Sequence, residues 1–426
     1  MAQPSNHREI LVYAHWESLE GPQLVGVLSS DRVRGNEVFS FSYHQDWLNN
    51  RYAQVIDPDL QLFSGRQYLA EGAKPNFGVF TDSSPDRWGR VLMRRREAAM
   101  ARQEQRAALT LFETDYLLGV YDEHRMGALR FKLSEEEPFL SDDRNLASPP
   151  WTSIRQLEEI SLKLEEDDVV DDPEYLNWLN MLIAPGSSLG GARPKASVVD
   201  PQGHLWIAKF PSKNDEGNIG AWEWVTYQLA IESGINMAEA QARTFSSNHH
   251  TFLAKRFDRS AVGGRIHFAS AMTMLGYADG NDFHDGVSYL ELVEFISTHG
   301  ASVKADLEQL WKRIVFSMCV CNTDDHLRNH GFILTNRGWK LSPAYDINPV
   351  ETGAGLKLNV SENENAIDFD LALEVAPYFG LKEKESLEII NGTKRVVSNW
   401  RVLAEETGIS RNEMELKANA FRLVNG

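Results

Sequence analysis

Three polar side chains in the last third of the chain have types and spacing that suit the handling of a phosphate group. Asp324 and Asn329 lie five residues apart in one loop, and Asp346 follows after a short strand-like stretch. In phosphoryl-transfer sites of this layout, the first carboxylate accepts the proton of the attacking hydroxyl, and the amide and the second carboxylate bind the metal ion. Negative charge builds on the phosphate oxygens, so hard oxygen ligands for Mg²⁺ are needed there. The spacing therefore predicts phosphoryl transfer, with a polar turn after the apolar residues 314–320 as the alternative interpretation.

Lys209 is the second candidate, because it lies inside an apolar stretch. Residues 196–200, a Pro-Gln-Gly turn and residues 205–210 predict a β-hairpin. A lysine in an apolar strand is costly unless it is paired. Phosphoryl-transfer enzymes place such a lysine on the phosphates and pair it with a helix glutamate, and Glu223 lies in the helix expected over residues 221–233. An edge-strand lysine that faces water is the alternative interpretation.

Two loops could complete a nucleotide site. Residues 185–195 contain many small residues, including Gly190 and Gly191, which let backbone N–H groups approach a ligand closely. The loop has neither Walker A spacing nor the usual glycine pattern of eukaryotic-type kinases, so a plain loop explains it as well. The strand expected over residues 251–255 runs into Arg256 and Phe257, where a hinge between two lobes would lie. An ordinary strand exit is the alternative there.

Composition indicates an ordinary globular protein. The chain has 426 residues, of which 42% are hydrophobic and 24% charged, which is enough for two or three domains. No apolar run approaches the roughly 20 residues that span a bilayer, and the polar N-terminus lacks a signal core, so we expect a cytoplasmic protein without membrane contact. Cys319 and Cys321 are expected to be buried thiols. The net charge of −18 disfavours direct binding to a nucleic-acid backbone.

The pattern of strands and helices divides the chain. The first part is β-rich, and the acidic, proline-containing residues 134–150 are the best candidate boundary. From residue 288 onward, helical periodicity dominates over residues 289–299, 303–321, 371–375, 383–407 and 412–423. We predict an α+β, two-lobed protein-kinase-like fold. Its parts are a β-rich N-terminal subdomain (1–150), a small lobe with the nucleotide loop and hairpin (151–257) and a helical large lobe with the catalytic loop (258–426).

The ordered set of motifs resembles the HipA-type serine/threonine kinase toxins of bacterial toxin–antitoxin modules. The matching segments, in family order, are residues 84–90, 127–131, 188–195, 208–211, 256–259, 323–329 and 345–347. Each segment is weakly specific alone, whereas the ordered set is specific. The resemblance implies a two-lobed kinase with an N-terminal extension packed on the small lobe. Asp325 departs from the pattern because relatives often carry Gly there, and Pro194 departs because relatives often carry an acidic residue.

The resemblance also implies roles for individual residues. Asp324 would be the catalytic base, Asn329 and Asp346 the Mg²⁺ ligands, and Lys209 the phosphate-binding lysine. Arg256 and Phe257 would lie at the adenine hinge, and Asp258 would lie near the ribose. The ATP site would also include Gly190, Gly191, Ala192 and Lys195 of the small-residue loop, together with His326. Ser188, with Ser187 beside it, resembles the family's regulatory autophosphorylation serine. A phosphate there would repel the phosphates of ATP.

The same resemblance implies partners. Family members of this kind phosphorylate a tRNA-charging enzyme, often glutamyl-tRNA synthetase. They are neutralised by a small, HipB-like DNA-binding antitoxin, so contact with DNA is expected only through the antitoxin complex.

Two other functions stay open. A metal-dependent hydrolase could use Asp324, Asp325, His326 and Asp346, and it would need neither Lys209 nor the hinge. Alternatively, the chain could be a catalytically silent binding protein whose only function is to recruit an antitoxin to DNA. The complete set of lysine, aspartates and asparagine argues against the silent protein, because binding needs none of them.

Overall fold

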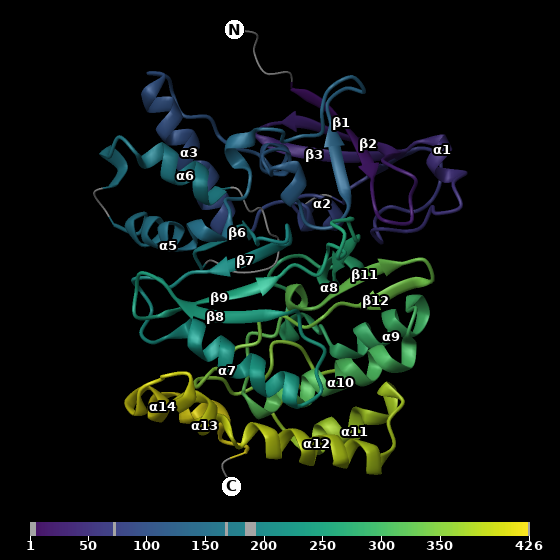
Figure 1. Ribbon diagram of the computed structural model, residues 1–426. Helices are drawn as coiled ribbons and strands as arrows, with labels where there is room; N and C mark the ends of the chain where they lie inside the picture. The colour runs from purple at the N-terminus through teal and green to yellow at the C-terminus, as the bar shows by residue number, and fades with distance from the viewer. Residues whose placement is uncertain (1–5, 71–73, 167–168, 184–192, 425–426) are drawn as a thin grey trace. The chain divides into compact units, whose positions relative to one another are not determined.

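The computed structural model describes residues 6–70, 74–166, 169–183 and 193–424. The chain forms two compact units, and both are made of separate stretches of sequence. Unit 1 comprises residues 1–207 and 258–279, and unit 2 comprises residues 208–257 and 280–426. Figure 1 labels their helices and strands. The three-part division expected from the sequence stays a prediction. In the described part of the chain, no helix is both long enough and apolar enough to cross a membrane.

A five-stranded antiparallel sheet is the centre of unit 1. Its strand order is β4-β3-β2-β1-β5. Along β1, alternate residues Ile10, Val12 and Ala14 are fully buried, which is the period-two pattern of a strand with one face on a core. The strands are β1 (His7–Ala14), β2 (Gln23–Val33), β3 (Asn36–Tyr43), β4 (Arg66–Tyr68) and β5 (Leu129–Lys132).

Helices and shorter strands make up the rest of unit 1. Asp86 is the N-cap of helix α3, because its carboxylate accepts a hydrogen bond from the backbone N–H of Gly89 at 2.9 Å. The elements are α1 (Gln45–Leu48), α2 (Gly78–Asp82), α3 (Arg87–Gln103), α4 (Glu113–Leu118), α5 (Ile154–Lys163), α6 (Tyr175–Ile183), β6 (Lys195–Val199), β10 (Phe268–Ser270), α8 (Ala271–Met274) and the 3₁₀-helices η1 (Asp122–His124), η2 (Arg144–Leu146), η3 (Trp151–Ser153) and η4 (Val169–Asp171). Strand β7 (Leu205–Lys209) runs across the boundary into unit 2.

Unit 2 is mostly helical and carries two β-hairpins. The hairpins are β8 (Ala240–Thr244) with β9 (His250–Lys255), and β11 (Gly331–Thr335) with β12 (Gly338–Leu341). The α-helices are α7 (Ile219–Glu232), α9 (Tyr289–His299), α10 (Val303–Cys319), α11 (Phe369–Val375), α12 (Glu383–Val397), α13 (Trp400–Glu406) and α14 (Arg411–Lys417). A short 3₁₀-helix, η6 (Leu327–Asn329), lies in the loop after α10.

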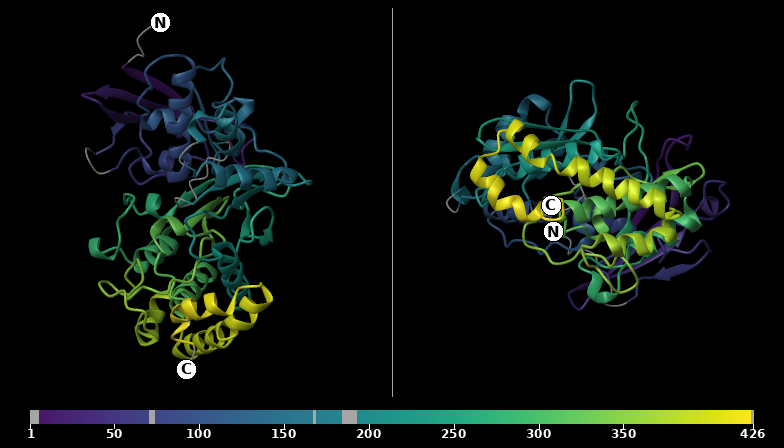
Figure 2. Two further views of the ribbon diagram at one scale, coloured as in Figure 1. Left: turned by 90° about the vertical axis from the view of Figure 1, so that its left-hand side faces the viewer. Right: turned by 90° about the horizontal axis from the view of Figure 1, so that it is seen from below.

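The C-terminal helices of unit 2 fix the position of α7. Figure 2 shows these helices, in yellow, gathered beside α7. The rings of Trp400 and Phe421 stack with centroids 4.3 Å apart, and Trp222 of α7 packs against both. The indole N–H of Trp222 also donates to the Glu413 carboxylate at 2.9 Å. This cluster holds the helix turn that carries Glu223, the residue next to Trp222.

Candidate functional site

Lys209 is the centre of a charged cluster in unit 2. Its ammonium lies 2.6 Å from Oε1 of Glu223 on α7 and 2.5 Å from Oδ1 of Asp346. Burial by itself would lower the pKa of Lys209, but the Asp346 and Glu223 carboxylates outweigh that effect and raise it. The lysine side chain is 13% exposed, so this strand lysine is paired and does not face water. The pair with Glu223 is the one that the sequence pattern anticipated.

Asp346 has an unusual backbone conformation. Its φ is +57°, in the left-handed region that a residue with a side chain seldom adopts outside turns. Such conformations cost roughly 1–3 kcal/mol and gather at functional sites. The carboxylate remains 24% exposed even though one oxygen contacts Lys209. It can therefore bind a ligand in addition to the lysine.

The loop after α10 brings Asp324 and Asn329 together. The side-chain N–H of Asn329 donates to the backbone carbonyl of Asp324 at 3.1 Å, and the Asn329 backbone N–H donates to the His326 carbonyl at 2.8 Å. Asp324 is an exposed residue, so a hydroxyl group of a protein substrate could reach its side chain. The turn begins at Cys321, whose φ of +47° ends the helical path of the chain.

The oxygen atoms of this region are suitable ligands for a hard cation. The Oδ1 atom of Asn329 is buried and has no hydrogen-bond partner among the described residues, and the same is true of Oδ1 of Asn348, two residues after Asp346. A buried oxygen without a partner costs roughly 1–3 kcal/mol, which a bound cation would offset. Amide and carboxylate oxygens are the ligands that Mg²⁺ takes. Asn348 was not singled out from the sequence, where an Asp-Ile-Asn run is a weak signal.

Asp325 turns into the protein interior. Its carboxylate accepts a hydrogen bond from the Tyr289 hydroxyl at 2.6 Å and lies 3.0 Å from Nε2 of His330. Burial would raise the pKa of Asp325, but the charge of His330 and the hydrogen bonds lower it overall. Asp325 therefore supports the loop that carries Asp324. Nothing in the sequence linked Tyr289, 36 residues away, to this loop.

The contacts of Asp325 with Tyr289 and His330 argue against the metal-dependent hydrolase, in which Asp325 would bind the metal ion. In the described part of the chain, no group of three or more His, Cys, Asp and Glu side chains is arranged to hold a metal ion. A site that combines Asn329 with Asp346 would include an amide ligand, as the phosphoryl-transfer layout requires.

We expect Tyr289→Phe to destabilise the protein by about 1.5–3 kcal/mol at neutral pH, because a buried carboxylate loses a hydrogen-bond donor. The folded-state pKa of Asp325 lies below its ordinary value of 3.8, so its contribution is present above that value and is lost as the pH falls through the folded pKa. The stability difference between wild type and variant should accordingly narrow in acid. Urea unfolding at several pH values measures it.

Tyr345→Phe is the matched control. The Tyr345 hydroxyl donates to the neutral backbone carbonyl of Arg328 at 2.8 Å in the same loop region. Its loss should cost less and show no such pH dependence. Equal and pH-independent losses in both variants would contradict the role of Asp325.

The remaining candidates fall into three groups. Arg256 is buried in unit 2, Phe257 stacks on Tyr345 there with ring centroids 5.6 Å apart, and the half-buried His326 lies in the loop between Asp324 and Asn329. In unit 1, Lys195 is buried and pairs with Asp86 at 2.7 Å, and Asp258 accepts a hydrogen bond from the Gly127 N–H at 2.8 Å. Five candidates lie outside the described residues: Ser187, Ser188, Gly190, Gly191 and Ala192.

The chain is similar in sequence to known proteins. The HipA-like C-terminal domain family matches residues 187–400, which is half of the chain. A protein of Haemophilus influenzae provisionally named a kinase is 28% identical over 183 residues, 38% of this chain and 52% of that protein. The serine/threonine-protein kinase toxin HipA of Shewanella oneidensis is 26% identical over 148 residues, 30% of this chain and 34% of that protein. The chain thus spans about half the length, or less, of these curated relatives.

The likeness in structure extends further than the likeness in sequence. The HipA chain in the solved complex of HipA, HipB and operator DNA from Shewanella oneidensis superposes with a TM-score of 0.65 at 16% identity. The match covers 97% of this chain and 95% of that chain. It confirms the expected fold, which is α+β and HipA-like, with a β-rich N-terminal subdomain and a mostly helical C-terminal lobe. The family match and the shared fold together show that this chain belongs to the HipA family.

Proposed function

We propose that the protein is an ATP-dependent serine/threonine protein kinase that acts as the toxin of a toxin–antitoxin module. The observation that carries the proposal is the position of Lys209 between Glu223 and Asp346, in the same unit as Asp324 and Asn329. A strand lysine paired with a helix glutamate, followed by an Asp, Asn and Asp set, is the arrangement that protein kinases use. The kinase names of the curated relatives support it.

Each side chain has a defined task in this proposal. Asp324 accepts the proton of the serine or threonine hydroxyl as that oxygen attacks the γ-phosphate. Lys209 binds the α- and β-phosphates, and Glu223 keeps its ammonium in place. Asn329 and Asp346 hold Mg²⁺, which supplies positive charge to the phosphate oxygens when bound.

The rest of the nucleotide site is proposed from the sequence pattern. Arg256 and Phe257 would contact the adenine, with Asp258 near the ribose. The stacking of Phe257 on Tyr345, which precedes Asp346, links the proposed hinge to the metal site within unit 2. Lys195, His326 and the loop with Gly190, Gly191 and Ala192 would surround the phosphates.

The proposed partners follow from the named relatives. One curated relative is named a toxin, and the solved relative is held in a complex with HipB and operator DNA. We propose a small HipB-like antitoxin as the binding partner of this chain, and DNA contact only through that complex. The net charge of −18 agrees with indirect contact, because a strongly acidic protein is repelled by phosphate backbones. The proposed substrate is a translation component such as glutamyl-tRNA synthetase or another aminoacyl-tRNA synthetase.

The test is incubation of the purified chain with bacterial lysate, Mg²⁺ and ATP carrying a labelled γ-phosphate, followed by mass spectrometry of the labelled proteins. A kinase of this kind should label one or a few proteins on serine or threonine. Calorimetry with Mg·ATP separates the alternatives, since a metal-dependent hydrolase or a silent antitoxin-binding co-repressor has no need to bind ATP. Absence of both labelling and ATP binding would overturn the proposal.

Autophosphorylation at Ser188 is a further expected outcome. A phosphoserine carries about −1.5 to −2 charges at neutral pH, so a phosphate beside the nucleotide loop should repel ATP and lower activity. Phosphopeptide mapping of wild type and Asp324→Asn, expressed in parallel, detects it. Phosphate on Ser188, or on the adjacent Ser187, should be found only in the active protein.

Two results would contradict this expectation. One is phosphate on neither serine in the active protein. The other is a Ser188→Asp variant that binds ATP as tightly as the parent, with Ser188→Ala as the uncharged control.

A further inference from the structure

The chain changes units immediately after the proposed adenine hinge. Phe257 is the last residue of a stretch in unit 2, and Asp258 is the first residue of the segment 258–279, which belongs to unit 1. Whatever fixes Asp258 therefore fixes the end of the hinge through a single peptide bond.

Asp258 and Arg259 are tied to the turn before β5. The buried Asp258 carboxylate accepts hydrogen bonds from the Gly127 N–H at 2.8 Å and from the Arg259 guanidinium at 2.7 Å. Arg259 also donates to the backbone carbonyls of Glu123 at 3.0 Å and Arg125 at 2.8 Å. Gly127 has a φ of +71°, and a Cβ there would lie 3.1 Å from the Phe268 nitrogen, so a larger residue would strain this close approach.

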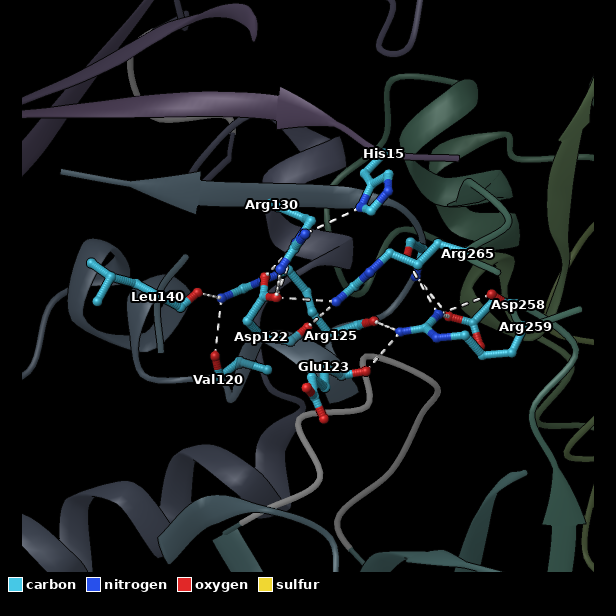
Figure 3. Close-up of polar contacts among 11 residues, drawn as sticks. His15, Val120, Asp122, Glu123, Arg125, Arg130, Leu140, Asp258, Arg259 and Arg265 are labelled. Atoms are coloured by element: carbon cyan, nitrogen blue, oxygen red, sulfur yellow. Dashed lines mark hydrogen bonds and ion pairs between the residues drawn. The ribbon is translucent and has the colours of Figure 1, made fainter. Parts of the chain in front are cut away.

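Asp122 holds the same segment at a second point (Figure 3). Its carboxylate contacts the Arg130 guanidinium at 2.5 Å and the Arg265 guanidinium at 3.2 Å, and Arg265 also donates to the Asp122 backbone carbonyl at 2.7 Å. Arg130 donates in addition to Nδ1 of His15, which follows β1. The three charged side chains come from η1, from β5 and from the segment after the hinge.

The ion pair between Asp122 and Arg265 is largely shielded from solvent. The Asp122 side chain is 6% exposed and that of Arg265 is 9% exposed. Removing one member of a buried ion pair leaves an uncompensated charge, which is far more costly than losing a surface pair. Farther along the segment, Ser270 donates from its N–H and its hydroxyl to the Asp82 carboxylate at 2.7 and 2.8 Å. The segment is thus fixed to the first stretch of unit 1, residues 1–207, at three separated points.

We propose that Asp122, Arg259 and Arg265 are positioning residues for nucleotide binding. Through these three residues, unit 1 fixes the position of the residue at which the proposed adenine hinge ends. The inference rests on the proposed kinase function.

The test compares Arg265→Gln with Arg130→Gln. Each variant removes one of the two guanidinium partners of Asp122, but only Arg265 lies on the segment that continues from the hinge. We expect Arg265→Gln to raise the KM for ATP by about 5-fold or more, in the range of coupling between separated sites, with kcat nearly unchanged. Arg130→Gln should lose a similar amount of thermal stability and keep the KM of wild type.

A second measurement needs no nucleotide, so it separates a failure of this inference from a failure of the kinase proposal. Hydrogen–deuterium exchange of the peptide covering residues 250–258 should increase in Arg265→Gln and stay at the wild-type level in Arg130→Gln. Equal exchange and equal KM in the two variants would overturn the positioning role. If exchange differed between the two variants but the wild-type protein bound no Mg·ATP, the kinase proposal and the link to nucleotide would be overturned. The anchoring of the segment by Arg265 would still be established.

Discussion

Asp324→Asn is expected to lower phosphotransfer by about 10²- to 10⁴-fold while Mg·ATP still binds. The variant keeps a side chain of the same shape but cannot accept the proton of the attacking hydroxyl, and general-base steps contribute a factor of this size. Asp324 is exposed, and its backbone carbonyl, which accepts the Asn329 hydrogen bond, is retained, so the fold should be unaffected. Transfer of labelled phosphate to protein, with calorimetric ATP binding in parallel, measures the effect.

The matched control is Asp370→Asn, which makes the same chemical change at an exposed position of α11. It should keep full activity. If Asp324→Asn retained wild-type phosphotransfer, or arrested growth in a test in which the wild type also did so, the carboxylate could not be the base. Loss of ATP binding together with activity would instead assign Asp324 to the nucleotide or metal.

Asp346→Ala is expected to weaken Mg·ATP binding itself, by about 10-fold or more, the scale on which altered metal sites lose affinity. The change removes the proposed charged ligand of the ion and also a carboxylate that pairs with Lys209. Calorimetry with ATP at saturating Mg²⁺ reports the loss directly.

Asp346→Asn controls for the backbone. Because Asn tolerates a φ of +57° better than Ala, the Asn variant keeps the local conformation while it loses the charge. Both variants should lose affinity if the charge matters. Recovery in the Asn variant would show that the Ala effect came from backbone strain, and unchanged affinity in both would count against a metal role.

Local patterns in the sequence predicted two features of unit 2 that the structure shows, while the roles of the residues in catalysis and binding stay predictions. The five-residue spacing of Asp324 and Asn329 and the lysine in an apolar strand are short-range signals. In the structure the Asn329 side chain donates to the Asp324 backbone carbonyl, and Lys209 pairs with Glu223. The fold class and the family, expected from the order of the motifs, are confirmed by the comparisons.

Contacts between distant residues could not be predicted in the same way. The ties of Asp258 and Arg265 to Gly127 and Asp122 join residues more than 130 positions apart, and charged residues in a loop give no hint of their partners. The helical periodicity over residues 383–407 did not reveal that the chain forms two helices there, α12 and α13, with a break at Ser398 and Asn399. The break lets Trp400 stack on Phe421, a requirement of tertiary packing that helical periodicity does not reveal.

The discontinuity of unit 1 has a consequence for how the protein is made. On the ribosome, Asp122 is synthesised 143 residues before Arg265, which at about 5–20 residues per second is a delay of roughly 7–29 s. Asp82 must likewise wait for Ser270, which lies 188 residues further on. During that interval Asp122 and Asp82 lack these later partners, which are synthesised only after the intervening stretch of unit 2. A product cut short before residue 258 would lack the whole closing segment and should be an easy substrate for cellular proteases.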